Sequence, residues 1–227
     1  MGKAISEEGK LRENRGTGTK ESYKPWIKIR EINSIGVSTS FPDWKHGRMV
    51  QLLSRGELAY YLLLRWNDDV DDIREQFPLD IERTDAIAEK LGFRKKRNGK
   101  YRMTTDMLVT MIDGSLFAVS INNTRADLKK SDRKVELQMI EYYYWKSLGV
   151  PWKILYKEDI NSIEVENIMD IVSYYNMKTV PDEIGLVKYL IAHKYILVDL
   201  KSPIDYKQLI EAVKEDEIWK KYSYMLG

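Results

Sequence analysis

Residues 106–122 read DMLVTMIDGSLFAVSIN, and this stretch decides the fold class. Two apolar runs, 107–112 and 116–121, flank Asp113-Gly114, a dipeptide that is typical of tight β-hairpin turns. The stretch therefore predicts two antiparallel strands, and the rest of the chain can be interpreted outward from this hairpin.

Helical signals lie on both sides of the predicted hairpin. Residues 54–57, SRGE, fit a capping box, and apolar residues follow them at helical spacing. A second helix is expected over 81–91, ended by Gly92, and a third over 132–145. A short strand is expected at 152–156. This order of elements predicts an α/β or α+β sandwich.

Differences in composition and in predicted elements divide the chain into three parts. Residues 1–40 are polar with an excess of basic side chains, and we expect a weakly structured basic arm that docks only through Trp26, Ile27 and Ile29. Residues 41–160 form the main predicted domain. The remainder, 161–227, is expected to be a small helical domain. Its predicted elements are helices at 162–176 and 184–194, a strand at 195–200, and a helix beginning at Ser202-Pro203.

Composition excludes several classes of chemistry. The 227 residues include no cysteine, which removes disulfides, thiolate metal sites and cysteine nucleophiles. The two histidines, His46 and His193, are too few for a histidine-built zinc site. Apolar runs are too short to span a membrane, and the polar N-terminus does not resemble a signal peptide, so we expect a cytoplasmic protein. The chemistry that remains favoured is a hard metal cation held by carboxylate side chains.

Charge is segregated along the chain although the formal net charge is only +2. Residues 67–85 carry eight acids and two bases, whereas residues 91–105 carry six bases and no acid. Clustered acids beside a basic loop suit an enzyme that uses a metal ion on a phosphate substrate. The alternative is ordinary solvated surface charge, which is the more common explanation for any single run.

The hairpin places a small set of polar residues near one another. A two-residue turn puts Asp106 opposite Ile121, whereas a three-residue turn puts Asp106 opposite Asn122 and brings Asp106, Ser120 and Asn122 to one face. Glu57 would lie in the first turn of the helix after Ser54. Each acid also has a structural explanation, because a capping box employs Glu57 and an acid at a strand edge often faces solvent.

Five segments make the sequence resemble the TnsA-type transposon-end endonuclease family. They match in order and spacing over about residues 23–160, and the string DIREQFPL is highly distinctive. The segments are Leu53-Ser54-x-x-Glu57-Leu58, Val70-x-Asp72-Ile73-Arg74-Glu75-Gln76-Phe77-Pro78-Leu79, Met103-Thr104-Thr105-Asp106-x-Leu108-Val109, Glu141-x-x-x-Trp145 and Pro151-Trp152. The tail after residue 160 is similar, more weakly, to the family's C-terminal winged-helix domain.

The resemblance implies an α/β fold: a restriction-endonuclease-like core, with a mixed sheet flanked by helices, and a small helical winged-helix-like C-terminal domain. The implied activity is cleavage of the 5′ strands at transposon ends, together with a TnsB transposase and the AAA+ ATPase TnsC. By residue-to-residue matching, Glu57 is the helix carboxylate and Asp106 the metal-bridging aspartate, and these two would hold Mg²⁺ or Mn²⁺. Glu141 is a supporting acid, and Gln76 lies near the site. The expected DNA-binding residues are Arg94, Lys95, Lys96, Arg97, Lys100 and Arg102.

One position departs from the family pattern. The active-site lysine of the family falls where this chain has Asn122. Asparagine is neutral and supplies no cation to the reacting phosphate, so cleavage should be slower by roughly 10²–10³-fold, by analogy with the loss of one oxyanion-hole donor. Three explanations stay open: an engineered inactive variant, a natural loss of cleavage, or a cation that has moved to Arg125 or Lys129.

Three functions follow from these observations. The leading hypothesis is a metal-dependent DNA endonuclease subunit of a cut-and-paste transposition machine, with impaired activity. The alternative is a non-cleaving assembly factor that bridges TnsB and TnsC. A stand-alone restriction-type nuclease is a distant third. Residues 142–145, YYYW, are able to stack on bases, but their helical spacing favours core positions for most of the rings.

Overall fold

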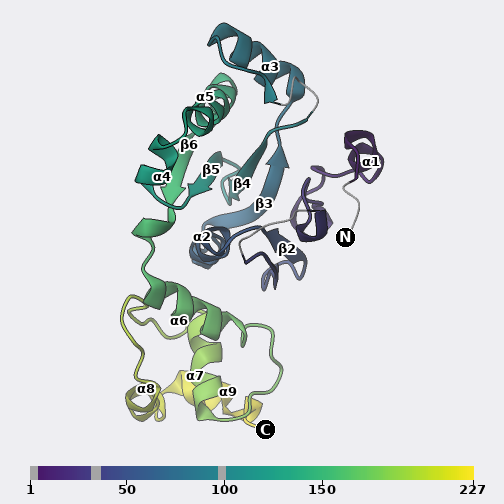
Figure 1. The fold of residues 1–227 in the computed structure, drawn as a ribbon. Helices are drawn as coiled ribbons and strands as arrows, with labels where there is room; N and C mark the ends of the chain where they lie inside the picture. The colour runs from purple at the N-terminus through teal and green to yellow at the C-terminus, as the bar shows by residue number, and fades with distance from the viewer. Residues whose placement is uncertain (1–4, 32–36, 97–100) are drawn as a thin grey trace. The chain divides into compact units, whose positions relative to one another are not determined.

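The computed structural model describes residues 5–31, 37–96 and 101–227 (Figure 1). The chain divides into two compact units, Met1–Ile160 and Asn161–Gly227. The first unit is built on a four-stranded mixed sheet in the order β3-β4-β5-β6. The strands are β3 (Val70–Pro78), β4 (Thr104–Met111), β5 (Leu116–Asn122) and β6 (Trp152–Tyr156).

The sheet combines an antiparallel meander with one parallel crossover. β3 pairs with β4 and β4 with β5 in antiparallel fashion, whereas β5 and β6 are parallel. The crossover between β5 and β6 runs through α4 (Arg125–Lys129) and α5 (Asp132–Ser147). The predicted mixed sheet flanked by helices is therefore confirmed. β3 was not foreseen as a strand.

The register of the hairpin differs from both expectations. Thr110 pairs with Leu116 and Met107 with Val119, so the loop consists of Ile112, Asp113 and Gly114. Gly114 adopts a φ of 82°, and its amide donates to the Met111 carbonyl at 2.9 Å. Ile112 leaves the ladder because its amide donates to the Asp69 carbonyl. Extending this register places Asp106 opposite Ser120, not opposite Ile121 or Asn122.

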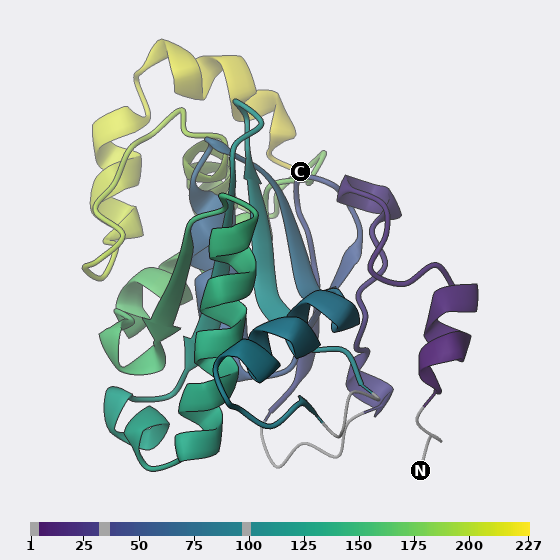
Figure 2. The same ribbon diagram turned by 90° about the horizontal axis from the view of Figure 1, so that it is seen from above.

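Helices cover both faces of the sheet, as Figure 2 shows from a second direction. α5 and α3 (Ile81–Lys90) pack on one face, where Ala88, Leu108, Ala118 and Ile140 belong to one buried cluster. α2 (Arg55–Trp66) contacts β3 and β5 from the other face. The helix starts predicted at Ser54 and the helix end predicted at Gly92 are confirmed, since Ser54 caps α2 and Gly92 has a φ of 68°.

Along β4, the alternation of side chains between the two faces of the sheet is interrupted at Asp106. Thr105 and Leu108 both face α5, since Thr105 accepts a hydrogen bond from Trp145 Nε1 and Leu108 packs in the same cluster as Trp145. Residues three apart normally face opposite sides of a strand. Opposite this point, Gln76 of β3 has a φ of 49°, a left-handed conformation that is unusual for a residue with a side chain. The irregularity separates β4 from β5 at Asp106.

The N-terminal residues are more ordered than the predicted basic arm. Tyr23 and Trp26 are buried, and the Trp26 amide donates to the Gln76 carbonyl at the edge of β3. Arg15 is fully buried and binds Glu31 at 2.6 Å. α1 (Glu7–Arg12) and two 3₁₀ turns (Lys20–Ser22 and Ile29–Glu31) complete this segment beside β3 (Figure 1). The arm docks because its basic groups have acidic partners within the unit.

A two-stranded ribbon of β1 (Thr39–Pro42) and β2 (Met49–Leu52) packs between this segment and α2. Arg65 of α2 is fully buried and binds Asp43 in the β1–β2 connection at 3.0 Å. The ribbon positions Leu53 and Ser54 at the start of α2. It therefore sets the location of the first helical turn, which carries Glu57.

The second unit is helical, with α6 (Ser162–Val172), α7 (Glu183–Ala192), α8 (Tyr206–Val213) and α9 (Glu217–Tyr222). The strand predicted at 195–200 is absent from these described residues, and α8 begins at Tyr206 after the cap Asp205 and not at Ser202-Pro203. One isolated bridge joins Val180 and Leu226. In the described part of the chain, no helix has the length and apolar character that crossing a membrane requires.

Candidate active site

Glu57 reaches the site from the first turn of α2. Its Oε1 accepts from the Ser54 hydroxyl at 3.0 Å, and its Oε2 accepts from the Leu53 amide at 2.9 Å. The Glu57 amide in turn donates to Ser54 Oγ at 3.1 Å. The side chain is only 7% exposed. The capping arrangement thus holds a buried carboxylate in one orientation, so its structural role and a role in chemistry are compatible.

Gln76 connects the two sides of the sheet at the site. Its Nε2 donates to Glu57 Oε2 at 3.1 Å, and its Oε1 accepts from the Thr104 hydroxyl at 3.4 Å. The left-handed backbone of Gln76 directs this buried amide out of the regular strand pattern. Unusual backbone conformations of this kind concentrate at functional sites because the surroundings must compensate for their cost.

Asp106 occupies the point where β4 and β5 separate. Its Oδ2 accepts from the Ile121 amide at 2.6 Å, so a side chain takes the place of a ladder hydrogen bond. Asp106 lies deep among protein atoms, yet part of the residue remains accessible. The residue is therefore not sealed from solvent, although the surrounding protein removes most of the water from its carboxylate.

Glu141 of α5 binds three side chains beneath Asp106. Its Oε1 accepts from the hydroxyls of Thr105 and Ser120 and from Trp152 Nε1, which lies at 3.0 Å. These partners come from β4, β5 and β6 respectively. Glu141 is 3% exposed, and its carboxylate therefore ties the sheet to α5 directly below the site.

The three carboxyl groups hold their protons unusually tightly. Burial, followed by repulsion from Asp106, raises the pKa of Glu57 to about 8. Burial raises the pKa of Asp106 to about 6, although hydrogen bonds from Ile121 and Gln76 and the charge of Lys96 act to lower it. Burial also raises the pKa of Glu141 to about 7. Removing water from like charges is the common cause, and such shifts concentrate at functional sites.

Asn122 ends β5 on the same face as Ser120. The β5–β6 pairing is regular from Ala118 to Asn122, so Ser120 and Asn122 share a face. Ile121 points the opposite way, toward α2, where a Cβ added to Gly56 would meet the Ile121 Cγ2 atom at 3.2 Å. The Nδ2 atom of Asn122 is buried and makes no hydrogen bond. A buried amide donor without a protein acceptor is unusual.

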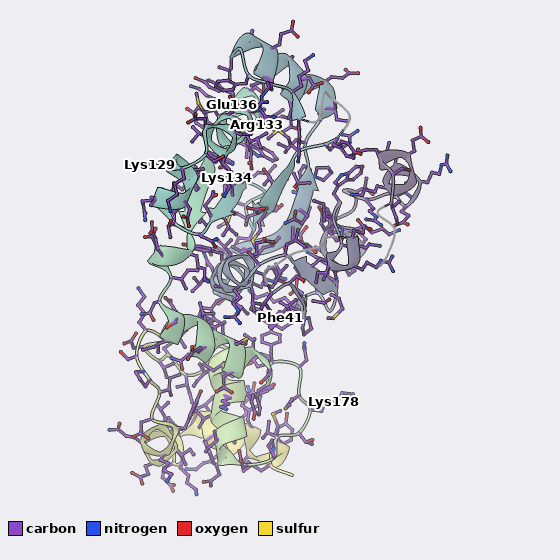
Figure 3. The ribbon with its side chains drawn as sticks, viewed as in Figure 1. Phe41, Lys129, Arg133, Lys134, Glu136 and Lys178 are labelled. Atoms are coloured by element: carbon purple, nitrogen blue, oxygen red, sulfur yellow. The ribbon has the colours of Figure 1, made fainter. Side chains whose placement is uncertain are left out.

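The candidates for a relocated cation differ in their surroundings. Arg125 binds Glu158 at 2.8 Å and Asp159 at 2.6 Å and lies over the Tyr156 ring, so its charge is already neutralised by two acids. Lys129 is the last residue of α4 and is followed along the chain by Arg133 and Lys134 at the start of α5, all three labelled in Figure 3. The positive charge of Lys96 lowers the pKa of Asp106. Lys96 Nζ donates at 3.2 Å to the carbonyl of Arg102, which precedes Asp106 by four residues.

The expected DNA-binding loop is only partly exposed for that role. Arg102 binds Glu7 and the Leu79 carbonyl and lies over the Trp26 ring, so it anchors the N-terminal segment. Lys95 is 3.6 Å from Glu89, and the carbonyls of Arg94 and Lys95 accept from Arg133 of α5. Arg97 and Lys100 lie outside the described residues. The described residues on either side of positions 97–100 are therefore fastened to neighbouring elements, while the side chains of Arg94 and Lys95 remain exposed.

Most of the acidic stretch has a structural role. Glu75 is fully buried and binds Arg48 at 2.6 Å, and buried Asp72 accepts from the Lys20 amide. Asp71 binds Lys20 at 2.8 Å. These acids join β3 to the β1–β2 ribbon and the N-terminal segment. These acids of the stretch therefore have structural partners, and the candidate ligands for a cation are instead Glu57 and Asp106.

The donor set fits a hard divalent cation. Two ionised carboxylates are the ligands that Mg²⁺ takes from proteins, with water and substrate phosphate oxygens completing its coordination. Within residues 5–31, 37–96 and 101–227, no group of three or more His, Cys, Asp or Glu side chains is gathered for metal binding. The fit therefore rests on two acids, Glu57 and Asp106. Their pKa values are raised, and a bound cation would lower them.

Comparison with known proteins agrees with this geometry. Residues 67–157 match the family model described as TnsA-like endonuclease N terminal, which spans β3 to β6. The chain is also similar to the transposon Tn7 transposition protein TnsA of Escherichia coli, with 37% identity over 161 residues that cover 70% of this chain. The chain belongs to the TnsA family. The similarity covers 59% of the length of the E. coli protein.

The observed mixed sheet, flanked by helices, is consistent with the restriction-endonuclease-like fold of a TnsA-family protein. Glu57 lies outside the matched range 67–157, whereas Gln76, Asp106, Asn122 and Glu141 lie within it. The structure brings Glu57, Gln76 and Asp106 together and places Glu141 beneath them. Sequence reasoning missed Thr105 and Ser120 as partners of Glu141 and missed the effect of Lys96 on Asp106, because these contacts depend on the break in β4.

Replacing Glu141 with leucine should lower the free energy of unfolding by roughly 2–5 kcal/mol, because the Thr105, Ser120 and Trp152 donors lose their acceptor in a buried site. Glu141→Gln keeps an acceptor oxygen and resembles the protonated form, so its cost should be much smaller. Urea unfolding at pH 7 measures both changes. Glu136→Gln, at a half-buried position on the same helix, is the matched control. Equal stability of the leucine variant and the native chain would contradict this role.

Proposed function

We propose that this TnsA-family chain is the DNA endonuclease subunit of a cut-and-paste transposition machine, which cuts the 5′ strands at transposon ends by metal-dependent phosphodiester hydrolysis. One observation carries the proposal. Gln76 and the break in β4 bring the buried carboxylate of Glu57 together with Asp106, a residue that remains partly accessible. Buried acids that repel each other are the arrangement that a catalytic cation stabilises.

Each residue of the site has a defined part in this proposal. Glu57 and Asp106 would hold Mg²⁺ or Mn²⁺, and the ion would supply an activated water and stabilise charge on the leaving oxygen. Gln76 fixes the orientation of Glu57, and Glu141 holds β4 and β5 in position below Asp106. Lys96 would contribute positive charge for the DNA phosphates beside the site.

Asn122 should weaken this activity. A lysine at this position would place a cation near the carboxylates, whereas Asn122 offers only a neutral amide whose Nδ2 has no acceptor. The raised pKa values of Glu57 and Asp106 are consistent with a site that lacks a full complement of positive charge. Metal binding through the two acids does not require the lysine, so we expect metal binding to persist while cleavage is slow.

The partners of the proposed machine are a TnsB-type transposase, which would cut the 3′ strands, and a TnsC-type AAA+ ATPase. To test the proposal, the chain is mixed with its cognate transposase, ATPase, transposon-end DNA and Mg²⁺, and the 5′ cuts are mapped at nucleotide resolution. We expect slow cleavage that Asp106→Asn abolishes. Surface variant Asp113→Asn is the control. Cleavage that survives Asp106→Asn would assign the cuts to another protein.

A second candidate function is a non-cleaving assembly factor that bridges the transposase and the ATPase. Asn122 is the observation that favours it, because the fold and the acids are retained while the expected cation is missing. If complexes form but 5′ cuts do not appear even in Asn122→Lys, this second function is supported. Rescue of cleavage by Asn122→Lys would instead identify a disabled enzyme.

A further inference from the structure

The second unit presents a column of stacked aromatic rings at its surface. His193 stacks on Tyr175 with ring centres 4.3 Å apart and on Tyr195 at 5.8 Å, both at 15° between planes. Tyr222 continues the column, 5.1 Å from Tyr195 at 26°, and Tyr224 lies 6.5 Å beyond Tyr222 at 28°. Five rings from three separate segments therefore stand nearly parallel.

The column is held rigidly at its base and is accessible at its far end. The His193 ring contacts the Tyr175 carbonyl at 2.9 Å through Nε2. Tyr195 and Tyr222 stack with ring centres 5.1 Å apart. By contrast, Tyr195 is 47% exposed and Tyr224 is 75% exposed. A planar ligand can extend the stack at Tyr224 without rearranging the residues below.

The ring-bearing segments are basic in sequence although the unit as a whole is acidic. Residues 161–227 contain eleven acids and eight lysines. The three ring-bearing segments, 173–177, 192–197 and 220–226, contain no acid and three lysines, namely Lys194, Lys220 and Lys221. Lys221 Nζ lies 5.3 Å from the centre of the Tyr222 ring, and its charge acts on the Tyr195 hydroxyl. Lys220 is paired with Glu215 at 3.8 Å, whereas the structure places Lys221 against a ring of the column.

Parallel aromatic rings with adjacent cations fit one class of ligand closely. Unpaired nucleobases stack on exposed aromatic side chains, and neighbouring lysines contact the phosphates between the bases. Duplex DNA buries its base faces and cannot use the column in this way. An apolar protein partner would not account for the lysine that lies over the Tyr222 ring.

We propose that the tyrosine column Tyr195–Tyr222–Tyr224, with Lys221, is a binding site for single-stranded DNA. This site is separate from the carboxylates of the first unit and needs no metal ion. It would retain an unpaired strand in the second unit through stacking, with little preference for sequence. The inference goes beyond the proposed endonuclease function and does not depend on it.

The test measures binding of a fluorescent fifteen-nucleotide oligo(dT) to the full chain by anisotropy, in EDTA and at fixed low salt. We expect Tyr224→Ala to weaken binding roughly 5- to 100-fold, the usual loss for one base–aromatic stack, and Tyr224→Trp to retain it. Leu197→Ala is the matched control, because Leu197 is 82% exposed in a ring-bearing segment but belongs to no stack. Lys221→Gln should reduce the salt dependence of binding.

An abasic oligomer of equal length separates stacking from simple charge attraction. If it binds as tightly as oligo(dT), or if Tyr224→Ala leaves the affinity unchanged, the proposal is wrong. Asp106→Asn should bind oligo(dT) normally. If neither the native chain nor Asn122→Lys cleaves but oligo(dT) binding is normal, the result counts against the endonuclease function alone, whereas cleavage without oligo(dT) binding counts against the tyrosine column alone.

Discussion

Replacing Asn122 with lysine should raise the rate of 5′ strand cleavage at a transposon end by roughly 100- to 1,000-fold. Asn122 ends β5, and the preceding residue, Ile121, donates its amide to Asp106 at 2.6 Å. A lysine at this position would place a flexible ammonium group on the Ser120 face of β5, next to the residue whose amide binds Asp106. Positioned charge at a reacting phosphate lowers the barrier because negative charge accumulates there in the transition state.

Single-turnover cleavage with an assembled complex measures this gain. Asn122→Gln extends the side chain without charge and should leave the rate unchanged. Asn123→Lys places the same charge one residue along, at an exposed position, and should give at most a small effect. If Asn123→Lys or Asn122→Gln matches Asn122→Lys, the gain does not come from a cation at the family position.

The same experiment examines Lys96 as a partial substitute for the missing lysine. Lys96 is anchored to the Arg102 carbonyl, and its charge lowers the Asp106 pKa. Lys96→Ala should therefore reduce cleavage more in the native chain than in Asn122→Lys. Lys45→Ala provides the control, since Lys45 is paired with Asp68 and is not among the expected DNA-binding residues. Equal losses in both backgrounds would mean that the two cations act independently.

The sequence predicted local elements well where one residue type determines the geometry. Ser54 and Glu57 form the cap that starts α2, Gly92 follows the end of α3, and the hairpin lies where Asp113-Gly114 placed it. β3 was missed because its inward positions carry Asp72, Glu75 and Gln76, which pair with groups distant in the chain. Alternation of apolar residues cannot reveal a strand whose buried face is polar.

The candidate site was predicted from its acids, but its construction was not. The bonds from Gln76 and Ile121 to the acids depend on the left-handed backbone at Gln76 and on the separation of β4 from β5. Neither residue is a glycine or proline that would mark such an irregularity. Tyr142 and Tyr143 were expected mostly in the core, yet they are 40% and 38% exposed, whereas Tyr144 and Trp145 are buried. Four successive helical residues cannot all face one side.

The predicted strand at 195–200 fails for a related reason. Its apolar composition suits a strand, but in the described residues of the second unit no other segment offers a ladder to pair with. An extended run without a partner gains no cross-strand hydrogen bonds. Its first residue, Tyr195, instead enters the aromatic column, and Leu197 remains exposed.

The affinity of the site for Mn²⁺ should increase about 100-fold between pH 6 and pH 8. A metal ion binds the ionised carboxylates, and the pKa values are about 8 for Glu57 and about 6 for Asp106. Over this interval the ionised fraction rises roughly 50-fold for a group of pKa about 8 and doubles for one of pKa about 6. Isothermal titration calorimetry in buffers of matched ionic strength measures the affinity, and the protons released on binding report the same groups.

The stability of the metal-free folded chain should decrease over the pH range in which the affinity for Mn²⁺ increases. A carboxyl whose pKa is raised by folding stabilises the folded state below its unfolded pKa of about 4, and this stability is lost as pH rises through about 8. In EDTA, the melting temperature should therefore fall from pH 5 to pH 8, and Glu57→Gln should flatten the decline while removing tight Mn²⁺ binding. Glu82→Gln, at the exposed start of α3, should change neither quantity. A native pH profile in Glu57→Gln would show that the proton taken up on folding resides elsewhere.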